Sequence, residues 1–117
     1  AFQQAGLMDE DTLVYGEEFG WQRRMRAKGW NAALVSEAQV VHLNTTQDLS
    51  GWKLAEHRKG MLNYFLRYQP RWQAMTLRAA LVIFHGLYAL AWWPVNSEKS
   101  NAHWQACLVG LKWRPAR

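Results

Sequence analysis

Two prolines divide the second half of the chain into short helical runs. Proline lacks a backbone N–H and its ring clashes with the preceding turn, so we expect Pro70 and Pro94 each to end a helix. The apolar residues around them recur at helical spacing, which predicts helices over Leu49–Tyr68, Trp72–Trp93 and Ser97–Trp113. This half is therefore expected to be a mainly α-helical tail of about three helices.

The first half of the chain has a mixed pattern. Residues Glu17–Lys28 are typical of a helix, with acids in the first turn and bases in the last, where the helix dipole stabilises each sign. The segments Asn31–Val35 and Gln39–Leu43 contain continuous apolar residues, which predict two short buried strands. We therefore expect an α/β fragment over residues 1–48, followed by the helical tail over residues 49–117.

The length and the first residues indicate part of a longer protein. The chain has 117 residues, about one domain. It begins with Ala1, and the residues up to Ala5 already have helical character that Gly6 is expected to end. The single cysteine, Cys107, excludes an internal disulfide and is consistent with a reducing compartment.

Charge is unevenly distributed between the halves. Residues 1–50 carry four Lys or Arg against seven Asp or Glu, whereas residues 51–117 carry ten against two. The halves are therefore −3 and +8, which gives the net charge of +5. An acidic half joined to a basic, Trp-rich half suggests that the first half carries the catalytic groups and that the second half attaches the protein to a membrane or a partner. The basic residues are dispersed and form no known nucleic-acid motif, so we expect no nucleic-acid partner.

The first half also holds the candidate chemical groups. Glu17 and Glu18 are adjacent acids at a predicted helix start, where the dipole keeps a carboxylate ionised and able to act as a base. The same pair also fits an ordinary solvated helix start. His42 follows the second predicted strand and is either a buried hydrogen-bonded histidine or a metal ligand. Arg24 and its basic neighbours fit either a diphosphate contact or a solvated helix face.

Four sequence blocks in this half occur in order and at close spacing. They are Gly6-Leu7-Met8-Asp9-Glu10, Tyr15-Gly16-Glu17-Glu18, Arg24-x-Arg26-Ala27-Lys28-Gly29-Trp30 and Glu37-Ala38-x-Val40-Val41-His42. Together they resemble the C-terminal part of the catalytic domain in family-2 glycosyltransferases, which are inverting enzymes with a GT-A (Rossmann-like) fold. The resemblance covers roughly residues 2–46. It implies that residues 1–48 are the C-terminal portion of a GT-A catalytic domain.

The resemblance implies roles for the matched residues. Glu18 matches the catalytic base, which takes the proton of the acceptor hydroxyl as that oxygen attacks the anomeric carbon of a nucleotide-sugar. Glu17 is then the neighbouring acid, and Trp21 and Arg24 lie on the acceptor or diphosphate side. His42 matches a histidine that joins a D-x-D motif in holding Mn²⁺ or Mg²⁺. The chain departs from the family in having Glu rather than Asp as the base and Gly20 in place of an acid.

We therefore expect part of a glycosyltransferase that moves a hexosyl or deoxyhexosyl group, with inversion, from a nucleotide-sugar donor to a carbohydrate or lipid-linked acceptor. Cell-surface polysaccharide or glycolipid synthesis is the expected setting. The donor-binding half precedes these blocks in the family, so this chain alone is expected to be inactive and to bind no cation. The alternative is a non-catalytic helical interaction or membrane-association module.

The run Ala79–Trp93 contains no charged residue. It is shorter than the about 20 apolar residues of a spanning helix. Trp92-Trp93 and the surrounding basic residues suit a helix that lies on an anionic membrane surface. The run fits equally well against the other helices or against a second subunit in a homo-oligomer. We expect a cytoplasmic location, peripheral on the inner face of the cell membrane.

Overall fold

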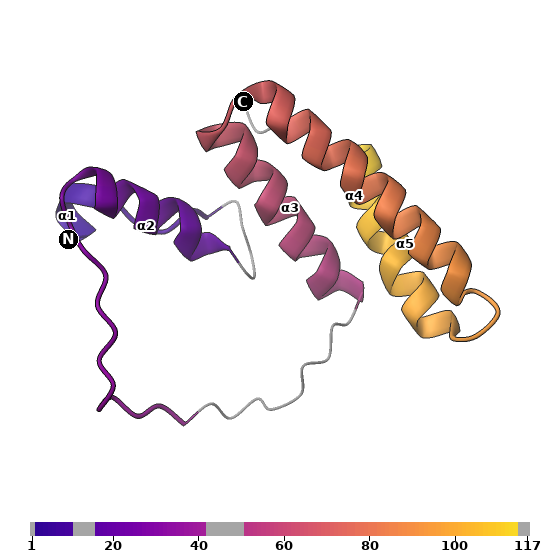
Figure 1. Cartoon of the computed structure of the whole chain (residues 1–117), viewed down its shortest axis with the longest axis horizontal. Coiled ribbons are helices and arrows are strands. Elements are labelled where there is room, and N and C mark those ends of the chain that lie inside the picture. Colours follow the sequence, from indigo (N-terminus) through magenta and orange to yellow (C-terminus); the bar gives the residue numbers. More distant parts are fainter. Residues whose placement is uncertain (1, 11–15, 42–50, 115–117) are drawn as a thin grey trace.

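The computed structural model describes residues 2–10, 16–41 and 51–114. Its helices are α1 (Phe2–Ala5), α2 (Glu17–Ala27), α3 (Gly51–Tyr68), α4 (Arg71–Trp92) and α5 (Ser97–Lys112). Figure 1 shows α3, α4 and α5 side by side, with the short pair α1 and α2 on the other side of α3. The described residues contain no strand, so this part of the chain is all-helical.

The predicted α/β fold with two short strands is therefore wrong. Residues 31–41 are irregular and exposed, and the side chains of Leu34 and Val40 are 96% and 88% accessible. A strand needs a neighbouring strand to bond its backbone N–H and C=O groups, and the described residues supply none. The apolar runs indicate a preference for burial, but the described part of the chain has no sheet to bury them. The end of the second run, residues 42–43, lies outside the described residues.

The helix predictions are confirmed with small differences at the ends. α2 begins at Glu17 as predicted, and Gly29 beyond its end has the left-handed φ of 84° expected of a helix-ending glycine. α4 begins and ends one residue earlier than predicted. α5 follows Asn96, whose side chain caps the helix by accepting the Lys99 N–H at 2.9 Å. Leu49, the predicted start of the third helix, lies outside the described residues.

Helices α3, α4 and α5 enclose a small apolar core. Its members are Leu62, Leu66, Leu77, Leu81 and Trp113. Leu62 is fully buried, and burial of one such side chain contributes about 1.5–3 kcal/mol. Trp113 lies just beyond α5, and its indole N–H donates to the Asn63 side chain at 2.9 Å. The end of α5 is thereby fixed to α3.

Close backbone contact joins α4 to α5. A Cβ atom at Gly110 would lie 2.6 Å from the Val82 side chain, so this position needs a glycine. Arg78 on α4 donates from Nε to the Gly110 carbonyl at 2.8 Å and from a terminal nitrogen to the Leu111 carbonyl at 3.0 Å. These bonds satisfy carbonyl groups that the end of α5 leaves without helical partners.

A polar chain crosses the same three helices at the fully buried His85. Arg58 Nε on α3 donates to His85 Nε2 at 3.0 Å, and the Nδ1 atoms of His85 and His103 lie 2.9 Å apart. Because Nε2 of His85 accepts, its Nδ1 carries the proton of the neutral ring and donates to His103. Burial, followed by the charge of Arg58, lowers the pKa of His85 to about 4 and also lowers the pKa of His103.

Candidate functional site

The predicted acidic pair occupies the first turn of α2. Gly16 precedes the turn with a left-handed φ of 108°, a conformation that favours glycine. Glu18 Oε2 accepts the Gly16 N–H at 3.2 Å, so this carboxylate also caps its own helix. Glu17 Oε2 is shielded from solvent and has no hydrogen-bond partner among the described residues. A buried carboxylate oxygen without a hydrogen-bond partner is unusual in a folded protein.

His57 on α3 lies within electrostatic range of this acidic turn. Burial and the charge of Arg58 lower the pKa of His57, against a smaller opposing effect of the Glu18 carboxylate. The ring is therefore neutral near pH 7. A neutral imidazole within electrostatic range of the Glu18 carboxylate is a group that can accept a proton.

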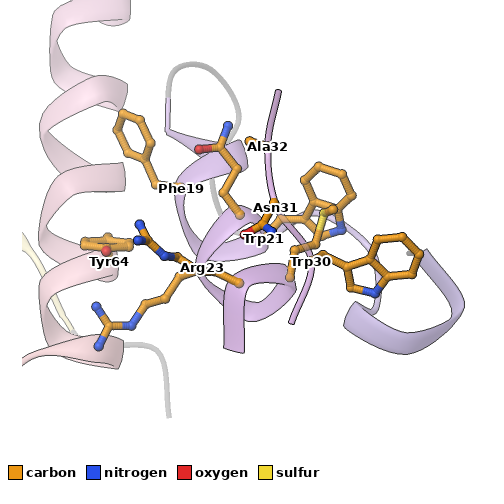
Figure 2. A pocket seen from close by; sticks show the side chains of 10 residues that line it. Phe19, Trp21, Arg23, Trp30, Asn31, Ala32 and Tyr64 are labelled. Atoms are coloured by element: carbon orange, nitrogen blue, oxygen red, sulfur yellow. The ribbon is translucent and has the colours of Figure 1, made fainter. Parts of the chain in front are cut away.

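An open cavity of about 700 Å³ lies along α2, and we call it the α2 cavity. Its aromatic and basic walls are formed by Phe19, Trp21, Arg23, Arg26, Trp30 and Tyr64. In Figure 2, Phe19 and Arg23 project from α2 toward Tyr64 on α3. Small-molecule sites typically have this size and a mainly apolar lining with a few polar groups.

The aromatic walls are held by contacts with α1 and α3. Trp21 stacks on Phe2 with ring centroids 4.7 Å apart and donates its indole N–H to the Gly6 carbonyl at 3.0 Å. The Trp30 indole N–H donates to the Gln4 side chain at 2.8 Å. The indole N–H groups of Trp21 and Trp30 are thus both held by residues at or near α1.

Arg24 is placed differently from Trp21. Its NH1 group donates to Asp9 Oδ1 and to the Tyr68 hydroxyl, each at 2.8 Å. Its Nε donates to the Ala5 carbonyl at 3.0 Å, and its NH2 donates to the Leu7 carbonyl. These bonds form what we call the Arg24 junction, which ties the end of α1 and the loop after it to α2 and α3. A diphosphate contact for Arg24 remains a prediction, while its observed contacts are within the fold.

The Arg24 junction also leaves no room for a side chain at position 20. Asp9 accepts a second bond from Arg67 NH1 on α3 at 2.8 Å, so its carboxylate joins two cations. A Cβ atom at Gly20 would collide with the Asp9 carboxylate and lie 3.1 Å from the Tyr68 hydroxyl. An acidic side chain at this position would therefore displace Asp9 and add a like charge beside it.

The predicted metal ligand, His42, lies outside the described residues. Over residues 2–10, 16–41 and 51–114, no group of three His, Cys, Asp or Glu side chains is close enough to hold a metal ion. The described residues therefore do not supply a ligand set for Mn²⁺ or Mg²⁺. The divalent cation, the nucleotide-sugar donor and the acceptor remain predictions.

No protein-family model, curated protein or solved structure matches this chain. The resemblance to family-2 glycosyltransferases therefore depends on the four sequence blocks alone. Of their predicted site residues, Trp21 lines the α2 cavity, and Glu17 and Glu18 lie in the first turn of the same helix.

Three aromatic walls of the α2 cavity, Phe19, Trp30 and Tyr64, were not predicted as site residues. Trp30 is part of the third sequence block, next to the helix-ending Gly29, so its position beside the basic end of the helix was an available signal. Tyr64 belongs to α3, and its place opposite Phe19 results from the packing of α2 on α3. Nothing in the local sequence indicates that contact.

Proposed function

We propose that this chain supplies the acceptor side and the catalytic base of an inverting nucleotide-sugar glycosyltransferase. The observation that carries the proposal is the position of the acidic turn on the helix that lines the α2 cavity. Phe19 directly follows Glu17 and Glu18 and forms one wall of that cavity. Aromatic side chains suit the apolar face of a sugar ring, and carboxylates suit its hydroxyl groups.

In the proposed reaction, an acceptor hydroxyl lies at the acidic turn with its sugar ring in the α2 cavity. Glu18 accepts the hydroxyl proton as the oxygen bonds to the anomeric carbon, and the bond from that carbon to the nucleotide diphosphate breaks on the opposite side. Glu17 accepts a hydrogen bond from a second acceptor hydroxyl and fixes the ring. The donor is held by a part of the enzyme outside this chain.

The role of Glu18 as the base can be tested by measuring the rate of sugar transfer in an enzyme that contains this chain. Glu18→Gln should lower kcat by about 10²-fold or more, because the amide cannot take the proton, while donor KM stays near its original value. Glu17→Gln is the matched neighbour and should chiefly raise the acceptor KM, because only a positioning hydrogen bond is weakened. Turnover retained by Glu18→Gln would remove Glu18 from the role of base.

The isolated chain provides a separate binding test. A soluble oligosaccharide acceptor should shift the amide resonances of α2, and Trp21→Ala should weaken that binding. Calorimetric titration with nucleoside diphosphates should show no heat of binding. Saccharide shifts confined to the tail, or measurable nucleotide binding, would contradict the assignment of the α2 cavity to the acceptor.

A further inference from the structure

One side of α4 is left uncovered by the described part of the chain. The inner side carries the buried residues Ala74, Leu81, His85 and Ala89, which recur at helical spacing toward α3 and α5. The opposite side exposes large apolar residues over the whole length of the helix and its end. This surface, the outer face of α4, comprises Trp72, Met75, Ile83, Leu87, Leu90 and Trp93. A continuous exposed apolar surface of this kind marks an interaction site.

The three-helix unit that carries the outer face is positively charged. Residues 51–114 carry nine Lys or Arg against two acids, Glu56 and Glu98. α4 begins at Arg71 and contains no acidic residue, while its other basic residue, Arg78, is bonded to the end of α5. At the other end of α4, Lys99 Nζ lies 4.5 Å from the centre of the Trp92 ring. A unit of this net charge is attracted to anionic lipid headgroups, which favour basic proteins with an exposed apolar face.

Tryptophans mark both ends of the outer face. Trp72 and Trp93 are exposed at opposite ends of α4, a helix of 22 residues and hence about 33 Å. Tryptophan is enriched at the level of lipid headgroups, where its ring is partly apolar and its N–H is hydrated. A second cavity, of about 430 Å³, adjoins Leu90, Trp93 and Trp104 at the α4–α5 end. Its apolar walls can take a hydrocarbon chain.

The inner face of α4 argues for a helix that lies on the bilayer rather than crosses it. α4 is longer than the run Ala79–Trp93 that was expected to be too short, and by length and composition alone it could cross a membrane. However, Arg58 from α3 donates a hydrogen bond to His85, which also contacts His103 of α5. Spanning would break these contacts or carry a charged Arg58 into hydrocarbon, which is costly.

We propose that the outer face of α4 docks flat on an anionic lipid bilayer. Ile83 and Leu87 enter the boundary between headgroups and acyl chains, and Trp72 and Trp93 lie among the headgroups at either end. α3 and α5 cover the side of α4 that faces away from the lipid. Docking does not depend on the sugar-transfer reaction.

Sedimentation with vesicles tests the docking. The chain should sediment with vesicles of phosphatidylcholine and phosphatidylserine, and less with phosphatidylcholine alone or at high ionic strength. The double variant Ile83→Glu/Leu87→Glu should reduce sedimentation at least about tenfold, because it places two charges in the apolar face. The control variant Leu34→Glu/Val40→Glu introduces the same two charges at exposed positions outside α4. It should sediment with vesicles as much as the unchanged chain does. Circular dichroism should show that both variants keep their helices, since all four side chains are exposed.

Three results would overturn the proposal. The first is no sedimentation with anionic vesicles at low ionic strength. The second is a dimer in solution that the α4 variant converts to a monomer without any vesicle binding, which would show that a second copy covers the outer face. The third is retention of the chain in the vesicle fraction after alkaline carbonate extraction, which would show a spanning helix instead of surface docking.

Discussion

The three-helix unit should lose stability on acidification because of His85. This buried ring accepts a hydrogen bond from Arg58 only while Nε2 is unprotonated. Protonation would place a second cation against Arg58, with His103 on the other side of the ring. The pKa of His85 is about 4 in the folded chain, against 6.5 for an ordinary histidine. Between these values the unfolded chain binds more protons, so stability falls as the pH drops below about 6.5 and this contribution is fully lost below about 4.

The size of the effect follows from the two pKa values. At about 1.36 kcal/mol per pH unit, a fall from 6.5 to about 4 removes about 3 kcal/mol of unfolding free energy. The lowered pKa values of His57 and His103 act in the same direction. Small domains have a total stability of about 5–15 kcal/mol, so the loss is a substantial fraction of the whole.

Urea unfolding, followed by tryptophan fluorescence at a series of pH values from about 8 to about 4.5, measures this loss. His85→Gln is the informative variant, because its amide oxygen can still accept from Arg58 but does not titrate. It should be less stable near pH 8 through poorer packing, yet change much less with pH. His57→Gln is the control and should keep most of the slope. A stability that is flat between pH 7 and 5, or a slope that survives in His85→Gln, would refute the reasoning.

Two further predictions concern packing. Leu62→Ala should lower the unfolding free energy by about 2–5 kcal/mol through a cavity in the core, whereas Leu87→Ala on the exposed side of α4 should change it by less than about 0.5 kcal/mol in the same urea titration. Arg24→Ala should release α2 from Asp9 and Tyr68. Amide hydrogen exchange should then become faster in α1 and α2, while α3, α4 and α5 keep their protection. A uniform loss of protection in all five helices would contradict a local role for the Arg24 junction.

The helices were predictable because their signals are local. Pro70 and Pro94 fix where helices end, and Gly29 closes α2 with a left-handed backbone that few other residues adopt. Strands have no such local signals, because a strand forms only beside another strand. The apolar residues of 31–41 match a strand in composition, but strand formation depends on a partner that the described residues do not provide.

The candidate site was predictable to a similar extent. Glu17 and Glu18 lie at a helix start, and one helix carries them and Trp21, so their relation follows from spacing. Contacts between segments far apart in the sequence follow from no such rule. The bond of Arg58 to His85 joins residues 27 positions apart, and that of Arg24 to Tyr68 joins residues 44 apart. Only the packing of the helices brings them together.

The Arg24 junction has a consequence for how the α2 cavity would bind a ligand. Any sliding of α2 along α3 must break the bond of Arg24 to Tyr68 and the bridge from Arg24 through Asp9 to Arg67, so these bonds oppose the motion. The distance between Phe19 and Tyr64, 6.2 Å between ring centroids, is therefore set before a ligand arrives. A preorganised site loses little conformational entropy on binding, so a weakly interacting sugar ring can keep more of its contact energy as affinity.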